Sequence, residues 1–183
     1  MTTILMLAAN PKRTTPLRLD QEAREIESSL QRATYREQLK LVMRWAVRPM
    51  DLQRALLETK PDILHFSGHG DGEVGLLLED EQGHVLHLNN AALEGLFQLF
   101  AGRIQCVVLN ACFSAVQAQL IGQYVPYVIG MNAAMGDQAA IDFEVVGFEG
   151  HEAISQSYEF KFDLRSEVPL QNINFLGRRA TFT

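Results

Sequence analysis

The chain has 183 residues, 47% of them hydrophobic and 21% charged, and a formal net charge of −6. Length and composition fit one ordinary globular domain with a substantial core. The negative charge argues against a non-specific nucleic-acid binder, which would present a basic face. No apolar run approaches the roughly 18 residues that span a bilayer, and residues 4–9 lack the flanks of a secretory signal. Neither nucleic acid nor a membrane is an expected partner.

Only two cysteines occur, Cys106 and Cys112. Their number and spacing do not suggest a disulfide framework. We therefore expect a reducing, cytoplasmic setting, which leaves a thiol available for chemistry.

Apolar runs of strand length alternate with segments of helical periodicity. Strands are predicted at residues 3–9, 38–47, 62–66, 104–109 and 125–131, the second at a sheet edge because it contains charged residues. Helices are predicted at residues 17–33, at residues 52–58, from a cap at Asn89 or Asn90 through Phe100, and at residues 113–122. Asp51 is the expected N-cap of the second helix, and Asn89 or Asn90 that of the third.

Other segments extend this pattern. Residues 74–78 and 84–88 resemble the two strands of a hairpin. A helix is predicted from Gly136 to Val146, and residues 158–164 alternate like an edge strand. The alternation of strands and helices predicts an α/β fold, with a mostly parallel sheet covered by helices on both faces, in a single domain.

In such sheets ligands bind beyond the carboxyl ends of the strands. His69 and Cys112 each follow a predicted strand, so we expect both at that edge. A thiolate is a strong nucleophile, and an imidazole can accept the thiol proton and later protonate a leaving amine. Singly, a cysteine or a histidine more often only packs in a core or lies at the surface. Their order and their place at two strand ends favour a catalytic pair.

The segments around both residues read FSGHG at 66–70 and LNACFS at 109–114. They resemble the CHAT domain, a branch of the caspase- and separase-like peptidases. The similarity covers most of the chain, and includes residues 7–11, 17–22, 51–56, 128–131 and 137–140. It implies a single CHAT domain over residues 1–183 with a caspase-like three-layer α/β/α sandwich. By the same resemblance His69 is the base, Cys112 the nucleophile, and the amides of Gly70 and Cys112 form the oxyanion hole.

Some positions depart from the patterns of related peptidases. Phe113-Ser114 stands where animal caspases have Arg-Gly, which removes an argument for aspartate specificity. Asn110 stands where basic-specific relatives carry Asp, so a preference for arginine or lysine loses support. Residues 149–151 replace an expected aromatic helix, and the chain after residue 147 matches least.

Substrate-binding residues have weaker signals. Lys12 and Arg13 follow the first strand and would either favour acidic substrate residues or be solvated loop charges. Asp137 would line the site or cap its helix. Asn110, two residues before Cys112, is the remaining candidate.

No metal and no cofactor are expected. The first two histidines, His65 and His69, span a strand and a turn rather than a helix, and the glutamate of a zinc-peptidase motif is missing. The glycines from Gly68 to Gly72 lack the Lys-Ser/Thr of a phosphate loop and lead into a strand.

The main hypothesis is a latent caspase-like cysteine endopeptidase that cleaves a protein or peptide and is activated by a regulatory or sensor protein. The alternative is a non-catalytic scaffold that uses the same fold for interactions. A third hypothesis is a cysteine hydrolase acting on small amides or esters. A homodimer through an exposed last strand is a further expectation about partners.

Overall fold

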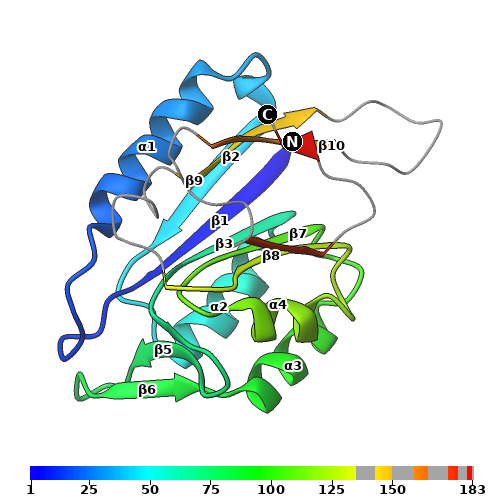
Figure 1. The fold of residues 1–183 in the computed structure, drawn as a ribbon. Helices are drawn as coiled ribbons and strands as arrows, with labels where there is room; N and C mark the ends of the chain where they lie inside the picture. Colours follow the sequence, from blue (N-terminus) through cyan, green and yellow to red (C-terminus); the bar gives the residue numbers. More distant parts are fainter. Residues whose placement is uncertain (135–142, 150–158, 165–172, 177–180, 183) are drawn as a thin grey trace.

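A computed structural model gives the fold of the chain (Figure 1). It describes residues 1–134 with their side chains and, further on, the backbone of residues 143–149, 159–164, 173–176 and 181–182. The central sheet consists of β1 (Thr2–Ala9), β2 (Leu39–Arg44), β3 (Ile63–Gly68), β7 (Cys106–Asn110), β8 (Tyr127–Met131) and β11 (Ile173–Leu176).

The strand order in this six-stranded sheet is β11-β8-β7-β3-β1-β2. Every pairing from β8 to β2 is parallel, and β11 joins β8 in the antiparallel direction. The position of β2 at one end confirms the predicted edge strand, whose charged Lys40 and Arg44 are exposed.

Helices cover both faces of the sheet. Helix α1 (Leu19–Arg32) lies on one face, and α2 (Pro49–Thr59), α3 (Asn90–Leu99) and α4 (Ala115–Ile121) lie on the other (Figure 1). A single 3-10 turn, η1 (Arg36–Gln38), leads into β2. The mostly parallel sheet between two helical layers confirms the predicted α/β/α sandwich, and this layout is that of a caspase-like fold.

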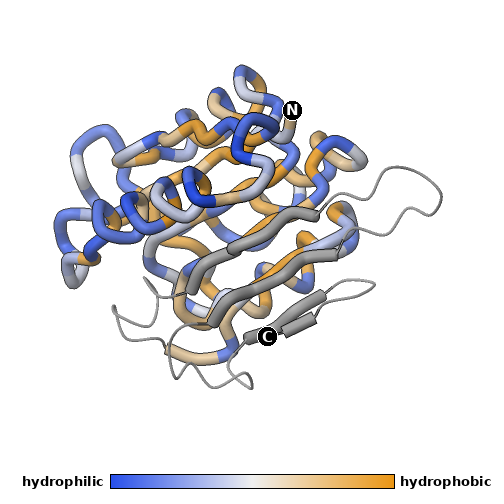
Figure 2. The backbone as a smooth tube through the Cα atoms, turned by 90° about the horizontal axis from the view of Figure 1, so that it is seen from above, coloured by the Kyte–Doolittle hydropathy of each residue, from blue (hydrophilic) through white to orange (hydrophobic). Residues whose placement is uncertain are grey.

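A hydrophobic core cluster lies between the sheet and α2, α3 and α4. It takes alternate residues from the strands, such as Leu64 and Phe66 of β3 and Val107 and Leu109 of β7, because successive strand side chains point to opposite faces. Hydrophobic residues follow the strands through the interior, and the surrounding loops are largely hydrophilic (Figure 2).

A small antiparallel sheet follows β3. It contains β4 (Gly70–Asp71), β5 (Gly75–Glu79) and β6 (Val85–Leu88), and Leu76 pairs with Leu88. This confirms the predicted hairpin and adds the short strand β4, which no apolar run signals. Asn89 is the N-cap of α3, where its side chain accepts a hydrogen bond from the amide of Ala92 at 2.9 Å.

Three predictions about local structure were wrong. Asp51 is not the N-cap of α2, because the helix already begins at Pro49 and Arg48 is the capping residue. Residues 143–146 lie in strand β9 (Phe143–Glu149) instead of a helix, as their aromatic and β-branched residues favour.

Strand β10 (Glu159–Leu164) is not an edge strand, since it lies between β9 and β12 (Thr181–Phe182) in a separate three-stranded sheet. The rest of the predicted helix, residues 136–142, lies outside the described residues. In the part of the chain that the structure describes, no helix has the length and apolarity to cross a membrane.

Candidate active site

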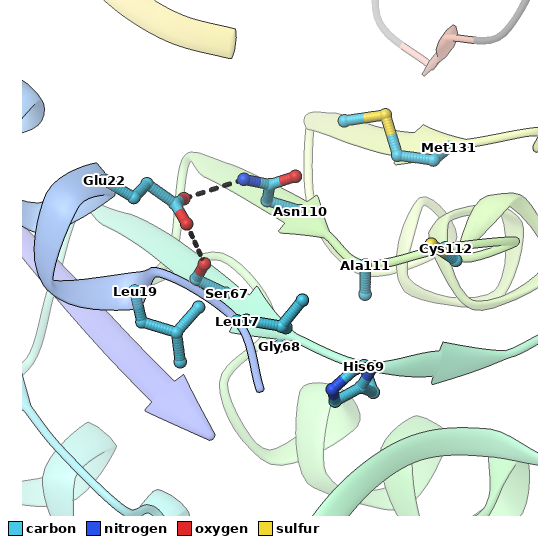
Figure 3. A pocket seen from close by; sticks show the side chains of 10 residues that line it. All are labelled: Leu17, Leu19, Glu22, Ser67, Gly68, His69, Asn110, Ala111, Cys112 and Met131. Carbon is cyan, nitrogen blue, oxygen red and sulfur yellow. Dashed lines mark hydrogen bonds between the residues drawn. The ribbon is translucent and has the colours of Figure 1, made fainter. Parts of the chain in front are cut away.

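The carboxyl ends of β3 and β7 carry the two predicted catalytic residues. The strands are parallel neighbours, with Ser67 paired with Asn110. His69 and Cys112 each come two residues later, so the two chains leave the sheet level with each other. Both side chains line one pocket (Figure 3), whose wall is formed by Leu17, Leu19, Glu22, Ser67, Gly68, His69, Asn110, Ala111, Cys112 and Met131.

The half-buried imidazole of His69 is held by the loop after β1. Its Nε2 lies 2.8 Å from the carbonyl oxygen of Thr15. A carbonyl oxygen only accepts hydrogen bonds, so Nε2 carries the proton and Nδ1 is the basic nitrogen of the neutral ring. The side chain of Asn10 holds this loop through hydrogen bonds with the backbone of Leu17, at 3.2 Å as donor and 3.4 Å as acceptor.

The backbones that follow the two strands are in close contact. A Cβ added to Gly70 would lie 2.3 Å from the carbonyl oxygen of Cys112, so only glycine fits at this approach. Phe113 has a φ of 55°, a conformation that bulky residues rarely adopt, and its side chain is exposed. The chain therefore turns sharply directly after the thiol.

Buried and partly buried hydrogen bonds fix this turn and the start of α4. The hydroxyl of Ser114 donates to the carbonyl of Leu109 at 3.0 Å and accepts from the amide of Met131 at 3.0 Å. The side chain of Gln117 donates to the carbonyl of Gly72 at 2.5 Å and to Oδ1 of Asn90 at 2.8 Å. Cys112 and the loop after His69 are thus both anchored to α4.

Four buried polar side chains, which we call the polar cluster, lie on the α1 side of the pocket: Glu22, His65, Ser67 and Asn110. Oε1 of Glu22 accepts from Nδ2 of Asn110 at 2.7 Å and lies 2.8 Å from Nε2 of His65. Oε2 of Glu22 accepts the hydroxyl of Ser67, and Figure 3 draws the bonds from Ser67 and Asn110. Glu22 therefore joins α1 to the ends of β3 and β7.

The remaining predicted site residues are the candidates for substrate binding: Asn110, Lys12, Arg13 and Asp137. Asn110 lines the pocket but is buried in the polar cluster. Lys12 and Arg13 are exposed and do not line the pocket, and the backbone amide of Lys12 bonds to Glu79 at 2.8 Å. Asp137 lies outside the described residues.

Two further observations concern the second cysteine and possible metal ligands. Burial raises the pKa of the Cys106 thiol to about 12, so this cysteine remains protonated and unreactive. Among the residues with described side chains, no group of three or more His, Cys, Asp and Glu could hold a metal ion.

Sequence reasoning did not identify the Thr15 carbonyl or the polar cluster. A backbone carbonyl in a loop has no sequence signature. Glu22 did have one, because it lies three residues after Leu19 and four before Ile26, on the side of α1 that should be apolar.

A mostly parallel sheet between helices, with a thiol and an imidazole at the ends of two adjacent strands, is the layout of a caspase-like protein. The family model of the CHAT domain matches residues 4–141, and the chain belongs to this family. It is also similar to a protein of Gillisia limnaea named "Probable protease", with 24% identity over 155 residues. That alignment covers 81% of this chain but only 27% of the relative, so the chain spans about a quarter of that protein. Together these similarities point to a caspase-like peptidase family.

Proposed function

We propose that the chain is a cysteine endopeptidase that cleaves a protein or peptide, with Cys112 as nucleophile and His69 as general base. The observation that carries this proposal is that both side chains line one pocket at the ends of paired parallel strands. The second free cysteine, Cys106, is fully buried and cannot compete for substrate.

In this mechanism Nδ1 of His69 accepts the proton of the Cys112 thiol, and the sulfur attacks the carbonyl carbon of the scissile bond. The bond from Nε2 to the Thr15 carbonyl orients the ring and stabilises the imidazolium that forms. The imidazolium then protonates the leaving amine, and water hydrolyses the thioester. The amides of Gly70 and Cys112 are the proposed donors to the oxyanion.

Regulation and location are parts of the same proposal. The relative named as a protease is several times longer than this chain, which supports control by a further protein or segment. We infer a latent enzyme activated by a regulatory partner. Two free cysteines suit a reducing compartment such as the cytoplasm.

The test is covalent labelling with a peptide acyloxymethyl ketone, read by intact-protein mass spectrometry with and without candidate activators. Wild type should gain one adduct, at Cys112. Cys112→Ala and His69→Ala should each abolish labelling. The matched controls are Cys106→Ala, which removes the buried thiol, and His84→Ala, which removes an exposed imidazole; both should label like wild type.

Hydrolysis of a peptide library by the same variants distinguishes turnover from labelling alone. A folded wild type that neither labels nor cleaves under any condition would refute the peptidase and favour a non-catalytic scaffold. Cleavage of small esters without cleavage of peptides would favour the small-molecule hydrolase instead.

A further inference from the structure

The pocket beside His69 and Cys112 combines apolar walls with a carboxylate. Leu17, Leu19 and Met131 contribute hydrocarbon surface, and Gly68 and Ala111 leave space because their side chains are small or absent. Glu22 contributes the negatively charged group, although it is only 2% exposed. A side chain that fills such a pocket needs an apolar stem and a polar end.

The charge of Glu22 is not balanced by a permanent cation among the described residues. Its hydrogen-bond partners are the neutral side chains of Ser67 and Asn110 and the imidazole of His65. No lysine or arginine in residues 1–134 forms an ion pair with it. Glu22 is therefore buried with His65 as its one ionisable partner among the described residues, and a buried carboxylate is stabilised by the approach of a permanent cation.

We propose that this pocket binds the side chain of an arginine or lysine, which lies immediately before the bond to be cleaved. The assignment of that position rests on the proposed peptidase function, because a carbonyl carbon at the Cys112 sulfur brings the side chain of the same residue to the pocket. The methylene groups contact the leucine walls, and the cation approaches the carboxylate of Glu22.

Other side chains fit the pocket less well. An acidic side chain would be repelled by Glu22, and the exposed Lys12 and Arg13 do not line the pocket to offset this. A leucine would cover the carboxylate and remove water without supplying a charge. Asn110 replaces the aspartate of basic-specific relatives, but Glu22 supplies a carboxylate from α1 to the same pocket.

Binding can be tested without catalysis in the Cys112→Ala variant of the full chain. Isothermal titration calorimetry would compare N-acetylated peptide amides that differ only in their last residue: arginine, lysine, citrulline, leucine or aspartate. Citrulline has nearly the shape of arginine but no charge. We expect arginine to bind about 10- to 100-fold more tightly than citrulline, the range for one hydrogen bond to a charged group.

The charge of Glu22 is tested by adding Glu22→Gln. The amide oxygen can still accept from His65 and Asn110, and the amide nitrogen can donate to the hydroxyl of Ser67, so the bonds of the cluster are preserved. This variant should bind arginine and citrulline equally. Glu27→Gln makes the same change at an exposed position of α1 and should keep the arginine preference.

Equal binding of arginine and citrulline, tighter binding of aspartate or leucine, or no binding of any peptide would each overturn the proposal. These outcomes do not depend on how Glu22→Gln folds, because they compare ligands on one protein. They are also separate from the peptidase test. Arginine binding without labelling of wild type would refute the enzyme alone, and labelling by a leucine probe without an arginine preference would refute this pocket alone.

Discussion

The two faces of the central sheet are built from the same strands but differ in chemistry. Towards α2, α3 and α4, β3 presents Leu64 and Phe66, which are part of a large apolar core. Towards α1, the same strand presents His65 and Ser67, which bond to the buried carboxylate of Glu22. Neighbouring residues therefore alternate between packing and hydrogen bonding.

This difference separates two ways of holding a strand in place. The apolar face contributes about 1.5–3 kcal/mol for each large side chain removed from water. On the polar face, hydrogen bonds mainly offset the cost of burying polar groups, so the net gain is small while the loss of one partner is costly. The first face stabilises the fold; the second fixes where the ends of β3 and β7 lie relative to α1.

The largest effect is expected on the apolar face. Phe66→Ala removes a fully buried ring and should lower the free energy of unfolding by about 3–5 kcal/mol. Urea unfolding followed by circular dichroism measures this change. The control is Leu99→Ala, at a leucine that is 69% exposed, which should change stability little. A loss below 1 kcal/mol for Phe66→Ala would mean that the ring does not support the sheet as described.

The backbone contact beyond the carboxyl ends of β3 and β7 is tested by Gly70→Ala. The new methyl group would overlap the carbonyl of Cys112, so the loop after His69 must shift. A displacement of catalytic groups by about 1 Å can cost roughly 100-fold in rate, and we expect a loss of that size in labelling of Cys112. Gly95→Ala adds the same methyl group in α3, where it meets nothing within 4 Å, and should leave labelling unchanged. If Gly70→Ala were labelled as fast as wild type, the close approach of Gly70 to the carbonyl of Cys112 would be contradicted.

The polar face is tested by Ser67→Ala, which removes one hydrogen-bond donor to Glu22. The loss should be about 1.5–3 kcal/mol, the range for hydrogen bonds to a charged group. The same substitution in a Glu22→Gln background should cost less, since the charge is gone. A double-mutant cycle from urea unfolding measures the difference. Equal losses in both backgrounds would show that Ser67 acts independently of the carboxylate.

The smallest effect is expected outside both faces, at the exposed start of α2. The side chain of Arg48 donates to Asp51 at 2.9 Å and holds the pKa of Asp51 below its ordinary value of 3.8. The charged form is thus favoured in the folded state, so its contribution is present above the ordinary pKa and is lost as the pH falls through the lowered one. Asp51→Asn should lower the melting temperature only slightly at pH 7, because solvent screens this exposed pair. The effect should be smaller at pH 2, where more of the Asp51 carboxyl groups are protonated. A larger effect at pH 2 than at pH 7 would contradict a stabilising role of the charged Asp51 side chain.

Much of the fold could be predicted because it follows local patterns. The apolar runs of β1, β3, β7 and β8 and the periodicity of α1 mark buried elements whatever their neighbours. The start of α2 was misplaced because Asp51 can cap a helix from two positions, and only the backbone distinguishes them. Strand β4 could not be predicted because two residues show no periodicity. A helix was predicted in place of β9 because a short apolar segment is compatible with a helix or a strand.

By itself, the sequence determined that a histidine and a cysteine follow two buried strands and that the chain alternates between strands and helices. Only the tertiary structure decided that these strands are neighbours, that the Thr15 carbonyl holds His69, and that Glu22 reaches the pocket from α1. The physical reason is the distance along the sequence between the residues that interact. Periodicity reports which face of an element is buried, whereas the hydrogen bond between Glu22 and Asn110 joins residues 88 positions apart. Such a contact exists only after the sheet has brought the two segments together.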